Sequence, residues 1–221
     1  MAQKIKPLGL RLGITEPWRS RWFFKRPLKF FIEEDFRIRQ IIKGKILTAG
    51  IAGIEIERTS QTIRASIKAS RPGLIIGRGG RGIEDLKNLI LKKIIQLRKE
   101  NKVSTVFSLN LNVEELKRTE ISAAVTAQQV AFDIERRVPY RVVLRRTLES
   151  LKQNKEVKGA KIKISGRLNG SEISRRDWVS FGRMPLQTIR AIIDYGEATS
   201  FNSYGTVGIK VWIYKGEVFE D

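Results

Sequence analysis

The stretch RPGLIIGRGGRGIEDL, residues 71–86, joins a short apolar segment, a glycine loop and the start of an amphipathic helix. Gly77 and Gly80 stand at the G-x-x-G spacing, which lets a backbone lie against four nucleotides of a single strand. A side chain at either glycine would hold the phosphates away, and the amides that open the following helix favour anions. The predicted nucleic-acid-binding loop consists of five residues: Gly77, Arg78, Gly79, Gly80 and Arg81.

Glycine pairs at this spacing also occur in ordinary turns, so the elements around the loop decide between the two interpretations. Hydrophobic periodicity predicts, in chain order, a helix over residues 30–47, strands over 54–58 and 63–68, a helix from the loop to about Lys99, and a strand over 107–113. This order of elements resembles a type II, or prokaryotic, KH domain, which has a three-stranded sheet with helices. The resemblance implies that the glycine loop binds RNA.

Three acidic residues, Glu33, Glu34 and Asp35, lie close to the predicted start of the first helix. Paired carboxylates can serve as a general acid and base, but no pocket signal accompanies these. Because negative charge in a first turn complements the helix dipole, the three are interpreted as helix N-terminal residues.

Composition bounds the class of protein. A chain of 221 residues forms one large or two ordinary domains, and a hydrophobic fraction of 41% suffices for packed cores. The net charge of +20 makes nucleic acid the expected partner, ahead of an anionic membrane. The sequence has no cysteine and no histidine. This excludes disulfides, thiolate zinc sites, cysteine nucleophiles and imidazole bases. We therefore expect no enzyme, metal site, cofactor or small-molecule substrate.

Hydropathy gives no membrane signal. No apolar run approaches the ~20 residues that cross a bilayer, and the N-terminal MAQKIKP lacks the apolar region of a signal peptide. The absence of cysteine fits a reducing compartment. A cytoplasmic protein without a membrane partner is expected.

The N-terminal residues 1–27 form a basic arm, in which aromatic residues lie among the charges and prolines interrupt any long helix. Two compatible roles remain open: the aromatics cover the arm's own domain, and the charges contact RNA phosphates. After this arm, the predicted divisions are a KH domain over 28–113, a C-terminal domain over 114–216 and a short tail over 217–221.

The second half of the chain opens with two predicted helices, separated near Pro139. Four alternating, strand-like stretches follow, over residues 160–165, 178–184, 189–195 and 208–214. Two helices on a four-stranded antiparallel sheet make an α/β sandwich, so the predicted fold class is α+β with two domains.

The second of these helices, from Tyr140 to about Lys152, lies in the densest arginine run of the chain. Such a run forms either a solvated helix face or a surface that follows phosphates, and the net charge favours the second interpretation. The arginines are Arg136, Arg137, Arg141, Arg145 and Arg146. Three aromatic residues of the strand region stay open between core packing and base stacking: Trp178, Phe181 and Tyr204.

Longer strings carry a resemblance to a family. They are QKIKPLGLRLGI and PWRSRWF in the arm, RPGLIIGRGG in the middle, and GAKIKISGRLNGSEISR, GRMPLQTIRAIIDY and YGTVGIKVWIYKGE in the second half. From residue 3 to residue 217 the chain resembles the S-three family of bacterial-type small-subunit ribosomal proteins. The resemblance implies a structural constituent of the small ribosomal subunit head. Its implied partners are small-subunit rRNA, mRNA and the ribosomal proteins numbered ten and fourteen, with those numbered two, four and five near it.

In the family, a basic patch on the helix that begins here at Tyr140 faces mRNA at its entry channel and helps to unwind it. By position the patch corresponds to Arg141, Val142 and Arg145, with Val142 standing where relatives usually carry a basic residue. Arg146 is a substitute that points about a third of a turn away from Arg145. The residues nominated as rRNA contacts are Lys4, Lys6, Arg11, Arg19, Arg21, Arg136, Arg137, Arg167, Arg175, Arg176 and Arg183.

Two other functions compete with this interpretation. One is a free-standing KH-type RNA chaperone or regulator. The other is an RNA-processing or DNA-repair enzyme, which the missing histidines, the missing cysteines and the lack of carboxylates spaced for metal oppose. The resemblance itself fits a cytoplasmic ribosome and does not exclude an organellar one.

Overall fold

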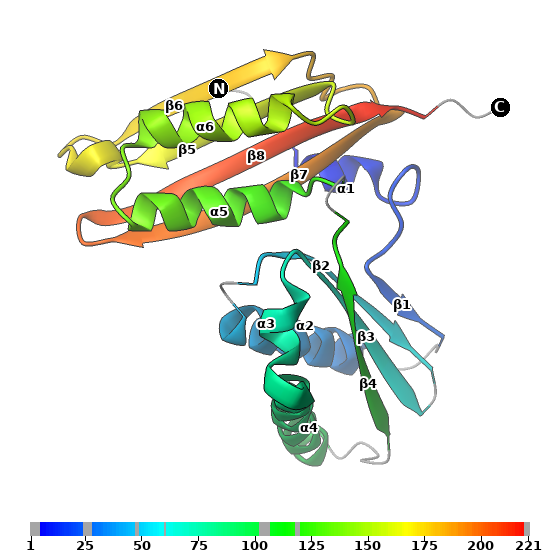
Figure 1. Ribbon diagram of the computed structural model, residues 1–221. Coiled ribbons are helices and arrows are strands. Elements are labelled where there is room, and N and C mark those ends of the chain that lie inside the picture. The colour runs from blue at the N-terminus through cyan, green and yellow to red at the C-terminus, as the bar shows by residue number, and fades with distance from the viewer. Residues whose placement is uncertain are drawn as a thin grey trace. The chain divides into compact units, whose positions relative to one another are not determined.

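The computed structural model describes residues 5–23, 28–46, 49–59, 61–101, 107–117 and 120–218 (Figure 1). The chain forms two compact units. We call Trp18–Leu116 the glycine-loop unit, and Met1–Pro17 together with Lys117–Asp221 the sandwich unit. The expected arm of residues 1–27 is therefore divided at Pro17, because its first part packs with the C-terminal half of the chain and its second part with the glycine-loop unit.

The glycine-loop unit follows the predicted order of elements. After β1 (Ser20–Trp22) these are α2 (Leu28–Lys45), β2 (Ile51–Arg58), β3 (Thr62–Ala69), α3 (Pro72–Ile76), the 3-10 turn η1 (Arg78–Gly80), α4 (Arg81–Glu100) and β4 (Ser108–Glu115). Its sheet has four strands in the order β1-β2-β3-β4. The β2–β3 pair is antiparallel, and the β1–β2 and β3–β4 pairs are parallel.

The fourth strand corrects the predicted three-stranded sheet. Strand β1 comes from the basic arm and pairs with the outer edge of β2, where Ile56 N–H donates to the Arg19 carbonyl at 2.9 Å. A strand of three residues is too short for alternation to reveal it in the sequence.

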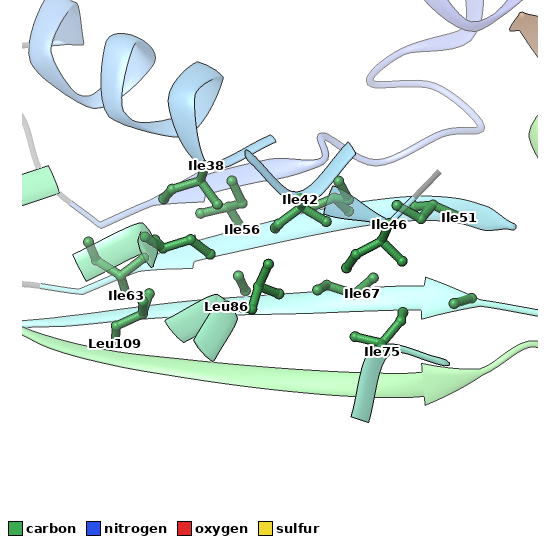
Figure 2. Close-up of a cluster of buried hydrophobic side chains, with 14 of the residues drawn as sticks. Ile38, Ile42, Ile46, Ile51, Ile56, Ile63, Ile67, Ile75, Leu86 and Leu109 are labelled. Carbon is green, nitrogen blue, oxygen red and sulfur yellow. The ribbon is translucent and has the colours of Figure 1, made fainter. Parts of the chain in front are cut away.

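The core of this unit lies between the helices and one face of the sheet. Ile38 and Ile42 of α2 are four residues apart and fully buried, as are Ile90 and Ile94 of α4. Figure 2 shows the α2 isoleucines directed at alternate residues of β2 and β3, among them Ile56. The helical period of 3.6 residues and the strand period of 2 residues therefore place apolar side chains in the same buried cluster.

A close backbone approach fixes the helix hairpin that carries the glycine loop. A Cβ on Gly82, in the first turn of α4, would lie 2.6 Å from the carbonyl oxygen of Ile75 and 2.9 Å from that of Ile76. Only glycine allows α3 and α4 to pack this closely.

Four charged residues are buried beside this core. Glu34 accepts from Arg58 Nη1 at 2.5 Å and from Arg98 Nε at 2.8 Å. Asp35 accepts from Arg58 Nε at 2.6 Å. The network joins α2, β2 and α4. The interpretation of Glu34 and Asp35 as helix N-terminal acids is therefore wrong, because α2 begins at Leu28, more than a turn earlier, and its first turn holds no acidic residue.

We expect Glu34→Ala to destabilise the glycine-loop unit by about 3–5 kcal/mol, because it leaves two guanidinium groups buried without their shared carboxylate. The matched control is Glu33→Ala, which removes a partly exposed neighbour that makes no ion pair among the described residues and should change stability by roughly 0.5 kcal/mol or less. Urea unfolding followed by tryptophan fluorescence measures both. Equal effects would show that the buried network does not stabilise the unit.

The sandwich unit contains α1 (Pro7–Arg11), α5 (Ala123–Glu135), α6 (Tyr140–Lys152), β5 (Gly159–Gly166), the 3-10 turn η2 (Leu168–Gly170), β6 (Arg175–Gly182), β7 (Ala191–Asn202) and β8 (Gly205–Glu217). Its four strands are all antiparallel, in the order β6-β5-β8-β7. Helix α5 covers β7 and β8, and α6 covers β5 and β6, on the same face of the sheet (Figure 1). This arrangement confirms the predicted two-helix, four-stranded sandwich.

Arg11 corrects a predicted phosphate contact. Its side chain is 0% exposed, and its guanidinium donates to the carbonyls of Ala191 at 2.6 Å and Thr188 at 2.8 Å, among others. Burial lowers the pKa of Arg11. Arg11 therefore fastens α1 to β7 and the segment before it, and it is not available to RNA.

None of the helices within the described ranges is long and apolar enough to cross a membrane.

Candidate nucleic-acid interface

The predicted glycine loop lies on the surface between α3 and α4. Gly77, Gly79 and Gly80 all have positive φ, at +70°, +63° and +80°. The space that a Cβ would take on Gly79 or Gly80 is empty, whereas one on Gly77 would lie 3.1 Å from the Gly82 nitrogen. Gly77 therefore shapes the turn, and Gly79 and Gly80 leave the backbone open to a ligand.

Charge and apolar surface meet at this loop. Arg78 and Arg81 are exposed on either side of Gly79, and Gly80 caps α4 without a side-chain hydrogen bond. The leading turn of α4 thus presents backbone N–H groups beside two cations. Leu74 and Ile76 of α3 are also exposed. Phosphates and the faces of unpaired bases can both be held here.

We expect Gly79→Asp to weaken the binding of single-stranded RNA about fivefold, because a carboxylate about 4 Å from a phosphate costs about 1 kcal/mol in water-like surroundings. Gly79→Asn is the matched control, since asparagine has nearly the same shape and also tolerates positive φ. Fluorescence anisotropy with a labelled oligoribonucleotide measures the difference. If both variants bind equally well, the loop is an architectural turn without a phosphate contact.

Helix α6 carries the second predicted cluster. Arg141 and Arg145 are exposed one turn apart, while Val143, Leu144 and Leu148 face the core. Arg141 Nε donates to the Tyr140 hydroxyl at 3.2 Å, which raises the pKa of Arg141. We name Arg141, Arg145 and the exposed Arg146 the α6 patch. Val142 is 55% exposed, so an apolar side chain lies on the surface next to Arg141.

The turn between α5 and α6 holds two further predicted contacts, Arg136 and Arg137. Both are exposed, and the Arg136 guanidinium lies 4.3 Å from the centre of the Phe132 ring. Stacking on the ring holds this guanidinium in place on the surface and leaves its edge available to phosphate. Arg137 adopts a positive φ of 62°, which is uncommon for a residue with a side chain.

The remaining predicted contacts are distributed over both units. Arg175, Arg176 and Arg183 are exposed in the sandwich unit, and Arg19 and Arg21 in the glycine-loop unit. Arg167 is exposed but also donates to the carbonyls of Ser171 and Tyr204, so part of its guanidinium is committed to the fold. Lys4 lies outside the described residues.

Lys6 is exposed and paired within the sandwich unit. Its Nζ lies 2.6 Å from Glu197 Oε1, and the Tyr195 hydroxyl donates to Glu197 Oε2 at 3.0 Å. The Lys6 hydrogen bond lowers the pKa of Glu197, and burial raises the pKa of Tyr195 to about 12. The pair neutralises part of the charge that Lys6 could offer to RNA.

One basic surface was missed in the sequence. Ile162 and Ile164 of β5 are buried under the helices, so Lys161 and Lys163 lie on the opposite face of the sheet. Lys163 pairs in register with Trp178 on one side and Lys210 on the other. Trp178 is 55% exposed, with Lys161 Nζ 4.6 Å from its ring, so this face combines cations with an aromatic surface. Alternation placed the lysines on one face, but only the strand order reveals their neighbours.

These features together define an RNA-binding protein with a KH domain and a second basic α+β unit. The KH domain family model matches residues 37–121, and the model described as ribosomal protein S3, C-terminal domain, matches residues 130–213. Two of the most similar relatives are both called small ribosomal subunit protein uS3. The protein from Campylobacter concisus (strain 13826) is 44% identical over the whole of this chain and 90% of its own length. The one from Desulfosudis oleivorans (strain DSM 6200 / JCM 39069 / Hxd3) is 44% identical over the whole of this chain and 98% of its own.

The chain belongs to the uS3 family of small ribosomal subunit proteins. Family membership confirms the resemblance carried by the glycine loop and by the strings of the second half.

Proposed function

We propose that this protein is a structural constituent of the small ribosomal subunit, where it binds rRNA and guides mRNA. The observation that carries the proposal is an identity of 44%, over the full chain, to proteins named for that subunit. The surface supports the proposal, because cations are presented to solvent at three places. These are the glycine loop, the α6 patch and the face of β5 and β8 that carries Lys161, Lys163 and Lys210.

Phosphate neutralisation is the mechanism of binding. The sequence has 43 Lys and Arg against 23 Asp and Glu, a surplus that repels itself in the free protein. Each single-stranded phosphate that a cation neutralises releases about 0.7 counterions, so affinity falls steeply with salt. Such contacts position the protein on RNA and read shape more than base sequence.

A non-catalytic role agrees with how the carboxylates are used. Among the three carboxylates considered as a possible acid–base pair, Glu34 is buried in ion pairs with Arg58 and Arg98, and Asp35 is buried in an ion pair with Arg58. A carboxylate buried in such ion pairs is closed to substrate. The relatives' names describe a ribosomal component and no reaction.

The proposal divides the surface between two kinds of RNA. The α6 patch lines the mRNA entry channel and helps to unwind incoming mRNA. The glycine loop and the other exposed arginines contact small-subunit rRNA. The neighbouring proteins are those numbered ten and fourteen, with two, four and five nearby, in a cytoplasmic or organellar ribosome.

We expect Arg141→Ala combined with Arg145→Ala to leave subunit assembly intact and to slow passage through structured mRNA. Losing two phosphate contacts should also reduce the slope of log affinity for single-stranded RNA against log salt concentration by about 1.4. A matched control is Lys43→Ala with Lys45→Ala, which removes equal charge from the exposed end of α2. Translation of hairpin-containing and unstructured mRNA by reconstituted ribosomes provides the measurement.

Two results would contradict the assignment of the α6 patch. One is an equal loss of assembly and of passage, which would make the patch an rRNA contact. The other is an equal slowing by the α2 control, which would make total charge the determinant.

A further inference from the structure

A cavity of about 360 Å³ opens at one end of the sandwich unit. Three connections form its walls: the turn between α5 and α6, the η2 turn after β5, and the β7–β8 hairpin. Figure 1 shows these elements at the end of the sheet where β7 turns into β8. We call it the hairpin cavity. Its principal lining residues are Arg137, Tyr140, Arg167, Asn169, Phe201 and Tyr204.

The walls combine aromatic rings with cations and amides. Phe201 is 73% exposed and Tyr204 is 59% exposed, a large apolar surface left uncovered at the hairpin tip. Arg137 and Arg167 contribute positive charge, and Asn169 contributes a side-chain amide. Rings supply stacking, amides supply donors and acceptors for a base edge, and arginines supply phosphate contacts.

The cavity walls are held in place by specific contacts. Arg167 Nη1 donates to the Tyr204 carbonyl at 3.1 Å, and Glu135 Oε1 accepts from Phe201 N–H at 3.0 Å. A Cβ on Gly170 would lie 3.2 Å from the Tyr204 ring, so the glycine lets the ring lie against the η2 backbone. The backbone of the hairpin tip is thus fixed to both neighbouring turns, and the Tyr204 ring lies against one of them.

Unusual backbone conformations also gather here. Among the described residues, Arg137 and Asn169 are the two non-glycine residues with positive φ, at 62° and 54°, and both line the cavity. Such conformations cost free energy and concentrate where a ligand is held.

We propose that the hairpin cavity binds an unpaired nucleobase, flipped out of the RNA strand that follows the α6 patch. The inference rests on the proposed RNA-binding function and adds to it a site that grips a base. Tyr140 connects the two sites, because it lines the cavity while its hydroxyl accepts from Arg141. The base stacks on Tyr204 and Phe201, and its flanking phosphates lie against Arg137 and Arg167. An apolar peptide would fill the same volume but would supply no anion to either arginine.

Photo-crosslinking of the full-length protein to a single-stranded octaribonucleotide containing 4-thiouridine tests the site. The wild-type protein is expected to crosslink at Phe201 or Tyr204 and, separately, at the glycine loop. Tyr204→Ala should reduce the cavity crosslink about tenfold, within the range that stacking on one ring contributes, and leave the loop crosslink unchanged. Tyr204→Leu keeps apolar bulk against Gly170 and should lose the crosslink as well, which separates stacking from folding. Phe36→Ala, which removes an exposed ring of the glycine-loop unit, is the control and should change neither crosslink.

The outcomes separate this site from the broader function. Crosslinks at the glycine loop without any in the cavity overturn the base site and leave RNA binding standing. The absence of both overturns RNA binding and the base site together. A cavity that never crosslinks, combined with Tyr204→Ala releasing a neighbouring protein from assembled subunits, would assign the cavity to a protein partner instead.

Discussion

The glycine-loop unit depends on the buried ion-pair network of Glu34 and Asp35 with Arg58 and Arg98. Three elements meet there, since the acids lie on α2 and the arginines on β2 and α4. Asp35 also accepts from Ser20 Oγ at 2.9 Å and Trp22 Nε1 at 3.1 Å, which adds β1 to the sheet. Arg98 lies in the last turn of α4, so the network holds the end of this helix that is remote from the glycine loop, while the close approach of Gly82 to α3 holds the loop end. Desolvating four charges is tolerable only because each finds an opposite partner.

The buried network carries no net charge, because two acids face two arginines, so most of the positive surplus of the sequence remains on the surface. Glu34 and Asp35 form ion pairs in the interior of the glycine-loop unit, and Glu197 accepts from both Lys6 and Tyr195. The exposed faces of α6, the glycine loop and β5 are left with cations that few acids offset. A free protein carries this surplus as self-repulsion, and an RNA polyanion removes it. Aromatic rings near several of the cations, such as Trp178 beside Lys161, add stacking surface to the same faces.

The sequence predicted what local periodicity and turn chemistry determine: the order of helices and strands around the glycine loop and the four-stranded sandwich. It could not reveal which charges are buried, because burial depends on contacts between distant residues. Arg11 and Arg141 look alike as sequence, yet one is enclosed by the carbonyls of Thr188 and Ala191 and the other is exposed. Similarly, the sequence could not show that Glu34 is buried against Arg98, because the two residues are 64 positions apart. The hairpin cavity escaped prediction for the same reason, since three separate turns form it.

The central claim is that this basic surface is built to lie on the RNA of the small ribosomal subunit. The most direct measurement is sedimentation of the native protein from cell lysate through sucrose gradients at increasing salt concentration. We predict that the protein sediments with the small subunit at low salt and is released steeply as the salt concentration rises, because many phosphate contacts from both units act together. Recovery of the protein at the top of the gradient at low salt, or a distribution that does not change with salt, would contradict the claim.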